Sequence, residues 1–242
     1  MAFYNFARAA DDVADDGSLS VEEKLAILNA MAAQLHNGAD APDMHVRDLV
    51  SSLAVSGVTS QHAQNLLKAF MWDAHHPRTA DWAALMAYCD LSAAPVGRYL
   101  IDLLGGCEGG YRSSDALCTA LQVLNHIQDI KDDRHTLDRV YVPSDWMVDS
   151  AISETDLDGS ECSPALRKVI NRMLDGVDGL LDEAAPLAKT IHSRALAREA
   201  SGILAIARKL SQRLRLRDPL AGRVALSKPA MAVHFAWGAL RA

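Results

Sequence analysis

The chain has 242 residues, enough for one domain around a single core; 50% of them are hydrophobic and only 5% are aromatic. The formal net charge of −7 argues against a nucleic-acid partner, because binding to phosphates needs a basic face. The four cysteines form no CxxC pair, and neither a secretory signal nor an apolar run of about 20 residues is present. These features predict a cytoplasmic protein that does not cross a membrane.

Apolar residues recur at helical spacing along the whole chain, and Gly or Pro marks the breaks. In chain order, we expect helices over 3–15, 20–35, 46–53, 60–72, 80–104, 114–133, 163–183 and 186–216, and a last one from 227. Ser20 and Glu23 form a capping-box pattern, Pro95 predicts a kink, and residues 139–143 leave regular helix. No repeat or linker marks a second domain, so the sequence predicts an all-α chain with one domain over residues 1–242.

The first predicted helix ends in four carboxylates, at Asp11, Asp12, Asp15 and Asp16. This placement is unfavourable, because the negative pole of the helix dipole lies at that end and like charges three or four residues apart repel each other. A solvated acidic face is the ordinary alternative for a run of charges. A solvated face does not explain why the sequence accepts the electrostatic cost of four carboxylates at this end of a helix.

The helix predicted over 114–133 also ends in acid. Gln122, Asn125, Asp129 and Asp133 are three or four residues apart and therefore share one face. The other residues of this helix are mostly apolar, so its polar face must line the interior or a cleft. Carboxylate and amide oxygens are ligands that suit Mg²⁺, whereas His and Cys at zinc-site spacing are absent from the sequence. Two such helices facing each other predict a magnesium and diphosphate site.

The same residues carry a resemblance to a known family. Tyr4-x-x-x-Arg8-x-x-Asp11-Asp12-x-x-Asp15 resembles the first aspartate motif of the squalene/phytoene synthases. The second motif is similar to Gln122-x-x-Asn125-x-x-x-Asp129-x-x-x-Asp133, followed by Asp138-Arg139-Val140-Tyr141-Val142-Pro143. Between them, Ser92-Ala93-Ala94-Pro95-Val96-Gly97-Arg98 resembles one subgroup, the hydroxysqualene synthases of the bacterial hopanoid pathway. The resemblance covers nearly the whole chain and implies the isoprenoid synthase fold, a helical bundle with a central cavity.

The resemblance also implies roles for individual residues. The metal ligands for Mg²⁺ would be Asp11, Asp12, Asp15, Asn125, Asp129 and Asp133, of which Asp11, Asp15, Asp129 and Asp133 are catalytic. Substrate contacts would come from Gln122, from the diphosphate-binding Arg8, Arg98, Arg139 and Tyr141, and from the apolar wall of Ala93, Val96, Leu121 and Leu124. Gly97 would leave room for the prenyl chain.

Alternatives remain open for some of these residues. Tyr4 and Tyr88 would be catalytic if their ring faces stabilise a carbocation, and ordinary core aromatics otherwise. The arginines could instead form surface salt bridges, an alternative that is weaker for Arg98, in an apolar segment, than for Arg139. Arg134 and His135 stand where the family usually has Tyr and Arg.

The implied function is Mg²⁺-dependent conversion of presqualene diphosphate to hydroxysqualene with release of diphosphate, in squalene and hopanoid biosynthesis. One alternative is condensation of two prenyl diphosphates, such as farnesyl diphosphate, to presqualene diphosphate, dehydrosqualene or phytoene. Another is a non-catalytic helical partner or assembly factor, because the chain starts without the upstream helix that family members usually have.

The predicted partners are a prenyl diphosphate substrate and other enzymes of the squalene pathway. The terminal helix carries Met231, Val233, Phe235, Trp237 and Leu240. Core packing is the first expectation for it, and peripheral contact with the inner membrane is the alternative.

Overall fold

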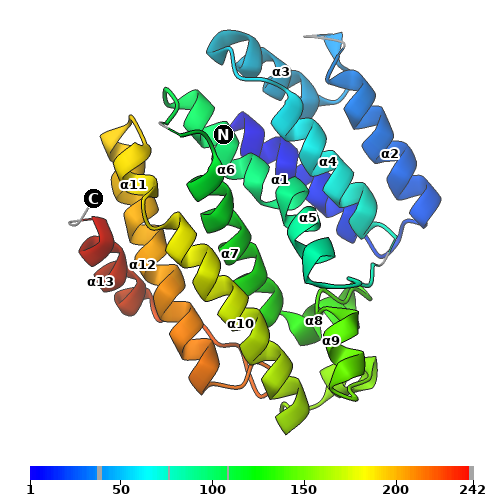
Figure 1. Cartoon of the computed structure of the whole chain (residues 1–242). Helices are drawn as coiled ribbons and strands as arrows, with labels where there is room; N and C mark the ends of the chain where they lie inside the picture. Colours follow the sequence, from blue (N-terminus) through cyan, green and yellow to red (C-terminus); the bar gives the residue numbers. More distant parts are fainter. Residues whose placement is uncertain (37–39, 76, 108, 240–242) are drawn as a thin grey trace.

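The computed structural model describes residues 1–36, 40–75, 77–107 and 109–239, and these ranges contain helices but no β-strand (Figure 1). The predicted all-α class is confirmed. The amino-terminal helices are α1 (Ala2–Asp15), α2 (Val21–Gln34), α3 (Met44–Ser56) and α4 (Gln61–Asp73). The middle of the chain forms α5 (Trp82–Ser92), α6 (Ala94–Leu103), α7 (Arg112–Gln128), α8 (Ile130–Thr136), α9 (Ser144–Asp149) and the 3₁₀ helix η2 (Glu154–Asp158). The last helices are α10 (Pro164–Ala184), α11 (Leu187–Thr190), α12 (Arg194–Leu216) and α13 (Lys228–Ala239).

Most predicted helices are present, and local sequence accounts for several of their ends. The Ser20–Glu23 capping box is confirmed at the start of α2, with Ser20 Oγ accepting from the N–H of Glu23 at 3.3 Å. Gly57 ends α3 with a φ of 73°, a left-handed conformation that glycine adopts without strain.

Three long predicted helices are each divided in the structure. The helix predicted over 80–104 breaks at Ala93, because Pro95 fits the first turn of a new helix and has no N–H to continue the old one. The helix predicted over 114–133 breaks at Asp129, whose φ and ψ are −107° and 12°. The helix predicted over 186–216 is α11 and α12, separated by an extended residue, Ile191. The predicted kink at Pro95 is thus a full break, and the predictions of unbroken helices over 114–133 and 186–216 were wrong.

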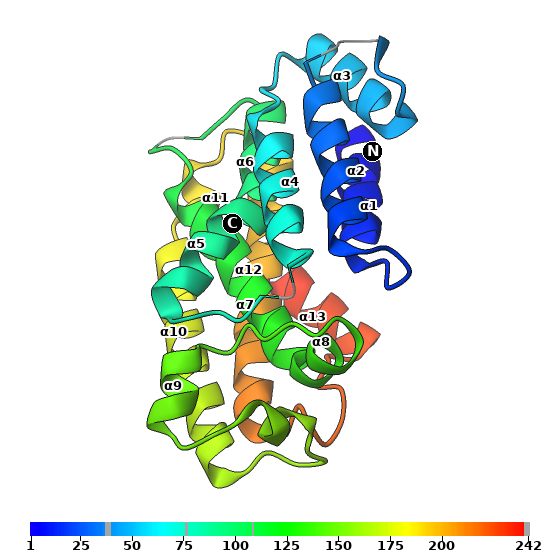
Figure 2. The ribbon, with the colours of Figure 1, turned by 90° about the vertical axis from the view of Figure 1, so that its right-hand side faces the viewer.

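The buried apolar residues form two clusters. One lies among α1–α4 and includes Phe6, Leu28, Leu49 and Leu66; the other lies among α5, α7, α10 and α12. Helix α6 belongs to both, because Tyr99 packs in the first cluster and Ile101 in the second. Figure 2 shows α1, α2 and α3 grouped on one side of the molecule. The assignment of residues 1–242 to one domain stays a prediction.

A non-helical segment follows α8, as predicted for residues 139–143. Val140 pairs with the segment after α4: its N–H donates to Pro77 O and its carbonyl accepts from the N–H of Thr79, both at 3.0 Å. This pairing holds residues 139–141 between α4 and the end of α7. No described helix has both the length and the apolar character needed to cross a membrane.

Candidate active site

The acidic end of α1 is half-buried and rich in negative charge. Phe6, Ala10 and Ala14 face the core, which leaves the carboxylates on the other side of the helix. Arg8 Nη1 contacts Asp11 at 2.9 Å, and its Nη2 contacts Asp12 at 2.6 Å. Burial, and then the neighbouring charge of Asp15, raise the pKa of Asp11 to about 6. A cation at this position would therefore lower the cost of holding several carboxylates together in a half-buried site.

Two buried cations stabilise the carboxyl end of α1. Arg139 donates from Nη1 to Asp15 at 2.7 Å and from Nη2 to the carbonyl of Ala14 at 3.0 Å. Lys24 Nζ donates to the same carbonyl at 2.9 Å. Positive charge at this pole of the helix dipole is favourable, which explains how the fold tolerates acidic residues there.

Asp73, at the end of α4, lies behind Arg139 and is only 4% exposed. Its two carboxylate oxygens accept from the hydroxyls of Tyr88, at 2.8 Å, and Tyr141, at 2.7 Å. Its main-chain carbonyl accepts from Arg139 Nε at 3.1 Å. Burial raises the pKa of Asp73, and Arg139 lowers it in part. Both tyrosines are thus anchored by their hydroxyls in the core.

The polar face of α7 and α8 reaches the other side of the Arg139–Tyr141 segment. Gln122 Nε2 lies 3.2 Å from His126 Nε2, and His126 Nδ1 lies 3.6 Å from Asp133. The His126 ring stacks on Tyr141 with ring centroids 3.7 Å apart. The N–H of Arg139 donates to the carbonyl of Asp133 at 3.1 Å. Arg139 therefore contacts Asp15 through its side chain and Asp133 through its backbone.

Asn125 and Asp129 complete this face. Asn125 is exposed on the last turns of α7, and Asp129 is half-buried at the break before α8. Burial and the charge of Asp133 raise the pKa of Asp129, and the charge of Arg223 lowers it in part. This second acidic group, like the first, holds neighbouring carboxylates in a half-buried position.

An apolar pocket lies farther along α7, between α6, α11 and α12. It encloses about 620 Å³, including its open mouth, and Val96, Gly97 and Leu121 are among its lining residues. Ala93 and Leu124 are buried in the core and are not among its lining residues. A Cβ at Gly97 would come 2.4 Å from Ser114 Oγ, so this glycine allows α6 to approach α7 closely.

Known proteins with similar sequences and structures agree with this geometry. The sequence model described as squalene/phytoene synthase matches residues 1–230. The chain is 39% identical to the hydroxysqualene synthase of Rhodopseudomonas palustris, over 99% of this chain and 82% of that one. It is 38% identical to the hydroxysqualene synthase of Zymomonas mobilis, over 93% and 76% of the two chains. The solved structure of squalene synthase HpnC from Alicyclobacillus acidocaldarius superposes with a TM-score of 0.79 at 29% identity, covering 89% of this chain and 81% of that one.

The chain belongs to the squalene/phytoene synthase family. The resemblance inferred from the aspartate motifs is therefore confirmed, and so is the isoprenoid synthase fold. Membership makes the chain a prenyl-transferring enzyme of squalene-type isoprenoid synthesis rather than a non-catalytic partner. The roles of individual residues stay predictions.

The donor atoms at the two acidic groups of this synthase suit Mg²⁺. Carboxylate and amide oxygens are hard ligands, and burial together with neighbouring carboxylates raises the pKa of both Asp11 and Asp129. Across the described part of the chain, no three His, Cys, Asp or Glu side chains converge closely enough to form a ready-made metal cluster. Asp15 is paired with Arg139 and Asp11 with Arg8, so cation binding here would have to displace or share these partners.

The environments of Arg98 and Arg139 are the reverse of the sequence-based expectation, in which ion pairing at the surface was less expected for Arg98 than for Arg139. Arg98 binds Asp115 through Nε and Nη2, at 2.8 and 2.7 Å, and Asp90 at 2.5 Å. Arg139, for which surface pairing was the more open alternative, is buried. Tyr4 is 64% exposed on α1. Neither Arg98 nor Tyr4 is among the residues that line the apolar pocket, so a contact of either with substrate would need a change of side-chain position.

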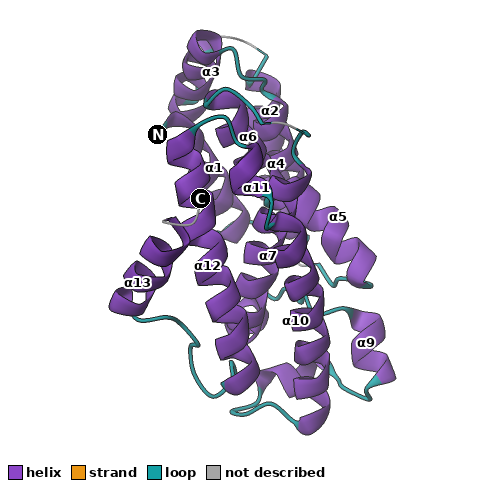
Figure 3. Cartoon of the chain, turned by 60° about the vertical axis from the view of Figure 1, so that its left-hand side comes forward, coloured by secondary structure: helices purple, strands orange, loops and turns teal. Residues whose placement is uncertain are grey.

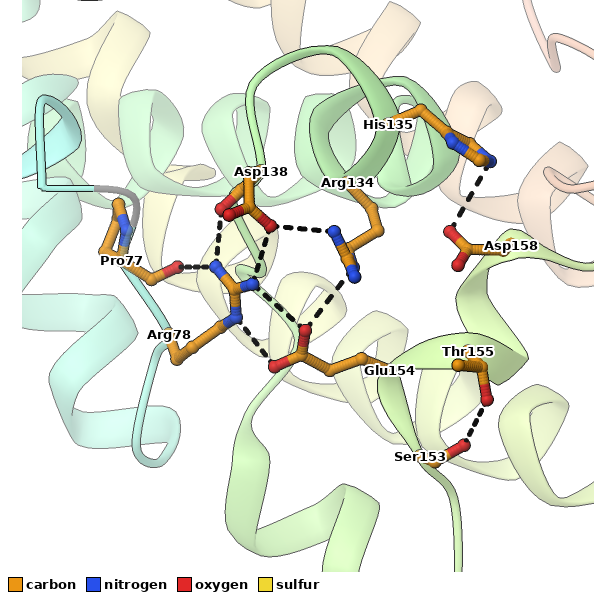
Figure 4. A network of polar contacts seen from close by, with 9 residues as sticks. All are labelled: Pro77, Arg78, Arg134, His135, Asp138, Ser153, Glu154, Thr155 and Asp158. Carbon is orange, nitrogen blue, oxygen red and sulfur yellow. Dashed lines mark hydrogen bonds and ion pairs between the residues drawn. The ribbon is translucent and has the colours of Figure 1, made fainter. Parts of the chain in front are cut away.

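A second charged network fixes the turn that carries Arg139 (Figure 4). Arg134 binds Asp138 at 2.7 Å and lies 3.3 Å from Glu154, while Arg78 binds both of these carboxylates. His135 lies 3.5 Å from Asp158 in η2. Arg134 and His135, which differ from the usual family residues, thus both pair with carboxylates of η2, and Arg134 also pairs with Asp138. The network holds α8, η2 and the segment after α4 together.

Sequence reasoning missed Lys24, Asp73, His126 and Arg223 at this site. Asp73 could have been found, because it extends the apolar face of Leu66 and Ala69 along α4, where a charged residue requires a partner. Arg223 lies in the segment between α12 and α13, and no local pattern links it to Asp129. Only the fold brings Arg223 close to Asp129.

Proposed function

We propose that this synthase converts presqualene diphosphate to hydroxysqualene, the product in the names of its relatives. The carbon–oxygen bond to the diphosphate breaks, the carbon skeleton rearranges as a cation, and water adds to that cation and loses a proton. The observation that carries the proposal is the position of Arg139, which contacts acidic residues of both motifs at one end of a helix that also lines an apolar pocket.

The two acidic groups would hold the metal. Asp11, Asp15, Asn125, Asp129 and Asp133 would bind Mg²⁺, which would act as a Lewis acid towards the leaving diphosphate. Asp12 has most of its side chain exposed and pairs with Arg8, so it would contribute charge at the edge of the site. Gln122 is half-buried one turn from Asn125, on the side nearer the pocket.

Arg139 and Arg8 would meet the charge that develops on the departing diphosphate. The guanidinium group matches phosphate oxygens through two parallel N–H donors. In the structure both arginines bind carboxylates of α1, so they are held close to the proposed metal ligands. Tyr141 and Asp73 would keep Arg139 in place from behind.

The apolar pocket would receive the prenyl chains. Val96, Leu121 and most of their neighbours are apolar and would restrict water, while Ser114, Cys118 and Glu199 are the polar side chains of the lining. Tyr88 would contribute its ring face rather than its hydroxyl, because the hydroxyl is bonded to Asp73. Since substrate and product are both lipids, the same proposal favours peripheral contact with a membrane and with other enzymes of the squalene pathway.

The proposal is tested by incubating the chain with presqualene diphosphate and Mg²⁺, then measuring released diphosphate and the mass of the extracted lipid. Hydroxysqualene is the expected product. The Asp129→Asn variant should lose about 100-fold or more in rate, whereas Asp132→Asn, an exposed neighbour, should keep the wild-type rate.

Farnesyl diphosphate serves as the competing substrate in the same assay. A condensation product from farnesyl diphosphate, with no turnover of presqualene diphosphate, would replace the proposal by the condensation alternative. Absence of diphosphate release from both substrates would reject it.

A further inference from the structure

Helix α13 is apolar around its whole circumference, yet most of it is exposed. Lys228 and His234 are its polar residues, and Gly238 is its buried residue. Its large side chains remain exposed: Met231 by 42%, Val233 by 65%, Phe235 by 37% and Trp237 by 56%. A helix of this composition is normally covered on all sides. We call these four side chains the α13 face.

The side chains of the α13 face are exposed although α13 is packed against the rest of the molecule. A Cβ at Gly238 would come 2.3 Å from the carbonyl oxygen of Ser201, and one at Gly202 would come 2.5 Å from the Phe235 ring. Helix α13 therefore lies directly against α12 through two glycines. Figures 1 and 3 show it at the outer edge of the molecule, next to α12.

Charge is distributed very unevenly along the chain. Residues 194–242 contain ten Lys and Arg against two Asp and Glu, a formal charge of +8. Residues 1–193 contain 14 Lys and Arg against 29 Asp and Glu, a formal charge of −15. The α13 face thus lies within the basic carboxyl-terminal segment of an acidic protein, in which Arg208 and Arg215 pair with carboxylates of α10. Such asymmetry is typical of a surface that binds polyanions or anionic membranes.

Basic and aromatic side chains meet in a groove between α12 and α13. Arg208 and Lys209 of α12 line it together with His234 and Trp237 of α13, and it encloses about 940 Å³ including its open side. Arg208 also binds Asp182, while Lys209 is exposed. An indole beside two cations, next to exposed aliphatic groups, is the arrangement found at lipid headgroups.

We propose that the α13 face and this groove dock the enzyme on an anionic lipid bilayer, the apolar side chains entering the headgroup region and the cations contacting phosphates. This proposal rests on the proposed function, which requires a lipid substrate and product. A second copy of the chain fits this face less well, because a two-fold interface would bring two segments of charge +8 together.

Docking would also place the catalytic pocket beside the lipid. Glu199 and Ile203 of α12 line the pocket, and they flank Ser201 and Gly202, against which α13 packs. On the other side of the pocket, Val96 and Leu100 are 41% and 39% exposed. A neutral prenyl product would leave this pocket close to the bilayer surface.

The test is flotation of the full chain with two kinds of vesicle, phosphatidylcholine alone and an equal mixture of phosphatidylcholine and phosphatidylglycerol. Binding is expected only to the mixed vesicles, and it should weaken as salt is added. Val233→Asp and Lys209→Glu should each lower the partition coefficient by about fivefold or more, since one cation near such a surface contributes roughly 1 kcal/mol. The matched controls are Val55→Asp and Lys68→Glu, exposed residues of α3 and α4 that should bind as wild type does.

Diphosphate release from detergent-dispersed substrate separates this proposal from the proposed function. Val233→Asp and Lys209→Glu should both keep the wild-type rate in that assay and the wild-type melting temperature. The docking proposal is overturned if the wild-type chain ignores the mixed vesicles, or if Val233→Asp and Lys209→Glu bind like their controls. It is also overturned if sedimentation shows a wild-type dimer that Val233→Asp dissociates, because the face would then join two copies.

Discussion

The apolar pocket and the charged junction around Arg139 lie along the same helix, α7, but they are stabilised in different ways. The pocket is bounded by side chains whose packing is already complete, with α6 and α7 in close contact at Gly97. At the junction, Arg139 neutralises carboxylates that the proposed metal would also use. The pocket is therefore ready for a ligand, whereas the junction must exchange an internal ion pair for an external cation.

The largest stability effect is expected at Asp73, the anchor of the junction. Asp73→Ala leaves two buried tyrosine hydroxyls without their acceptor and removes the carboxylate charge beside Arg139, whose bond to the main-chain carbonyl remains. It should lower the free energy of unfolding by about 3–5 kcal/mol. Urea unfolding measures this difference. Asp132→Ala, on an exposed position of α8, is the control, and an Asp73→Ala variant as stable as that control would show that the network contributes little.

The next effect distinguishes the two arginines. Arg139→Ala should reduce diphosphate release by about 100-fold, because it removes charge from the site of the leaving group. Arg98→Ala removes only partly exposed ion pairs and should change the unfolding free energy by about 1 kcal/mol or less, with a rate close to wild type. Steady-state rates of diphosphate release by the two variants measure this difference. Equal losses would place Arg98 in the catalytic site, as the sequence pattern first suggested.

Packing at the pocket is tested with a pair of glycines. Gly97→Ala inserts a methyl group against Ser114 and Cys118 and should destabilise the chain by about 1–2 kcal/mol. Gly179→Ala, in α10, meets open space and should stabilise it by up to about 1 kcal/mol through helix propensity. The two melting temperatures should therefore move in opposite directions. A shift of the same sign in both would mean that α6 and α7 are not in tight contact.

The smallest effect concerns pH. The pKa of Asp11 is raised to about 6 in the folded chain, from 3.8, mainly by burial. The folded chain then binds a proton more readily than the unfolded chain, so acidification from about pH 7 to about pH 5 should stabilise the metal-free protein. Asp11→Asn should show a weaker rise in melting temperature over this range. An identical rise in both would assign the effect to other carboxyls.

Helix type and the two acidic groups could be predicted from the sequence, because helical spacing, capping residues and unfavourable charges are local features. Pro95 already marked a kink near Ala93, but nothing local in the sequence marked the breaks at Asp129 and Ile191. The partners of Arg98 and Arg139 were also beyond reach. Asp115 is 17 residues from Arg98 and Asp15 is 124 residues from Arg139, and only the tertiary fold selects between such distant carboxylates.

Binding of inorganic diphosphate in the presence of Mg²⁺, measured by calorimetry, tests most directly whether the two acidic groups act together. Asp15→Asn in α1 and Asp129→Asn at the end of α7 should each weaken binding by about tenfold or more, while Asp16→Asn and Asp132→Asn, their exposed neighbours, should bind as wild type does. If Asp15→Asn or Asp129→Asn binds diphosphate with wild-type affinity, the two groups do not share one ligand, and the account is contradicted.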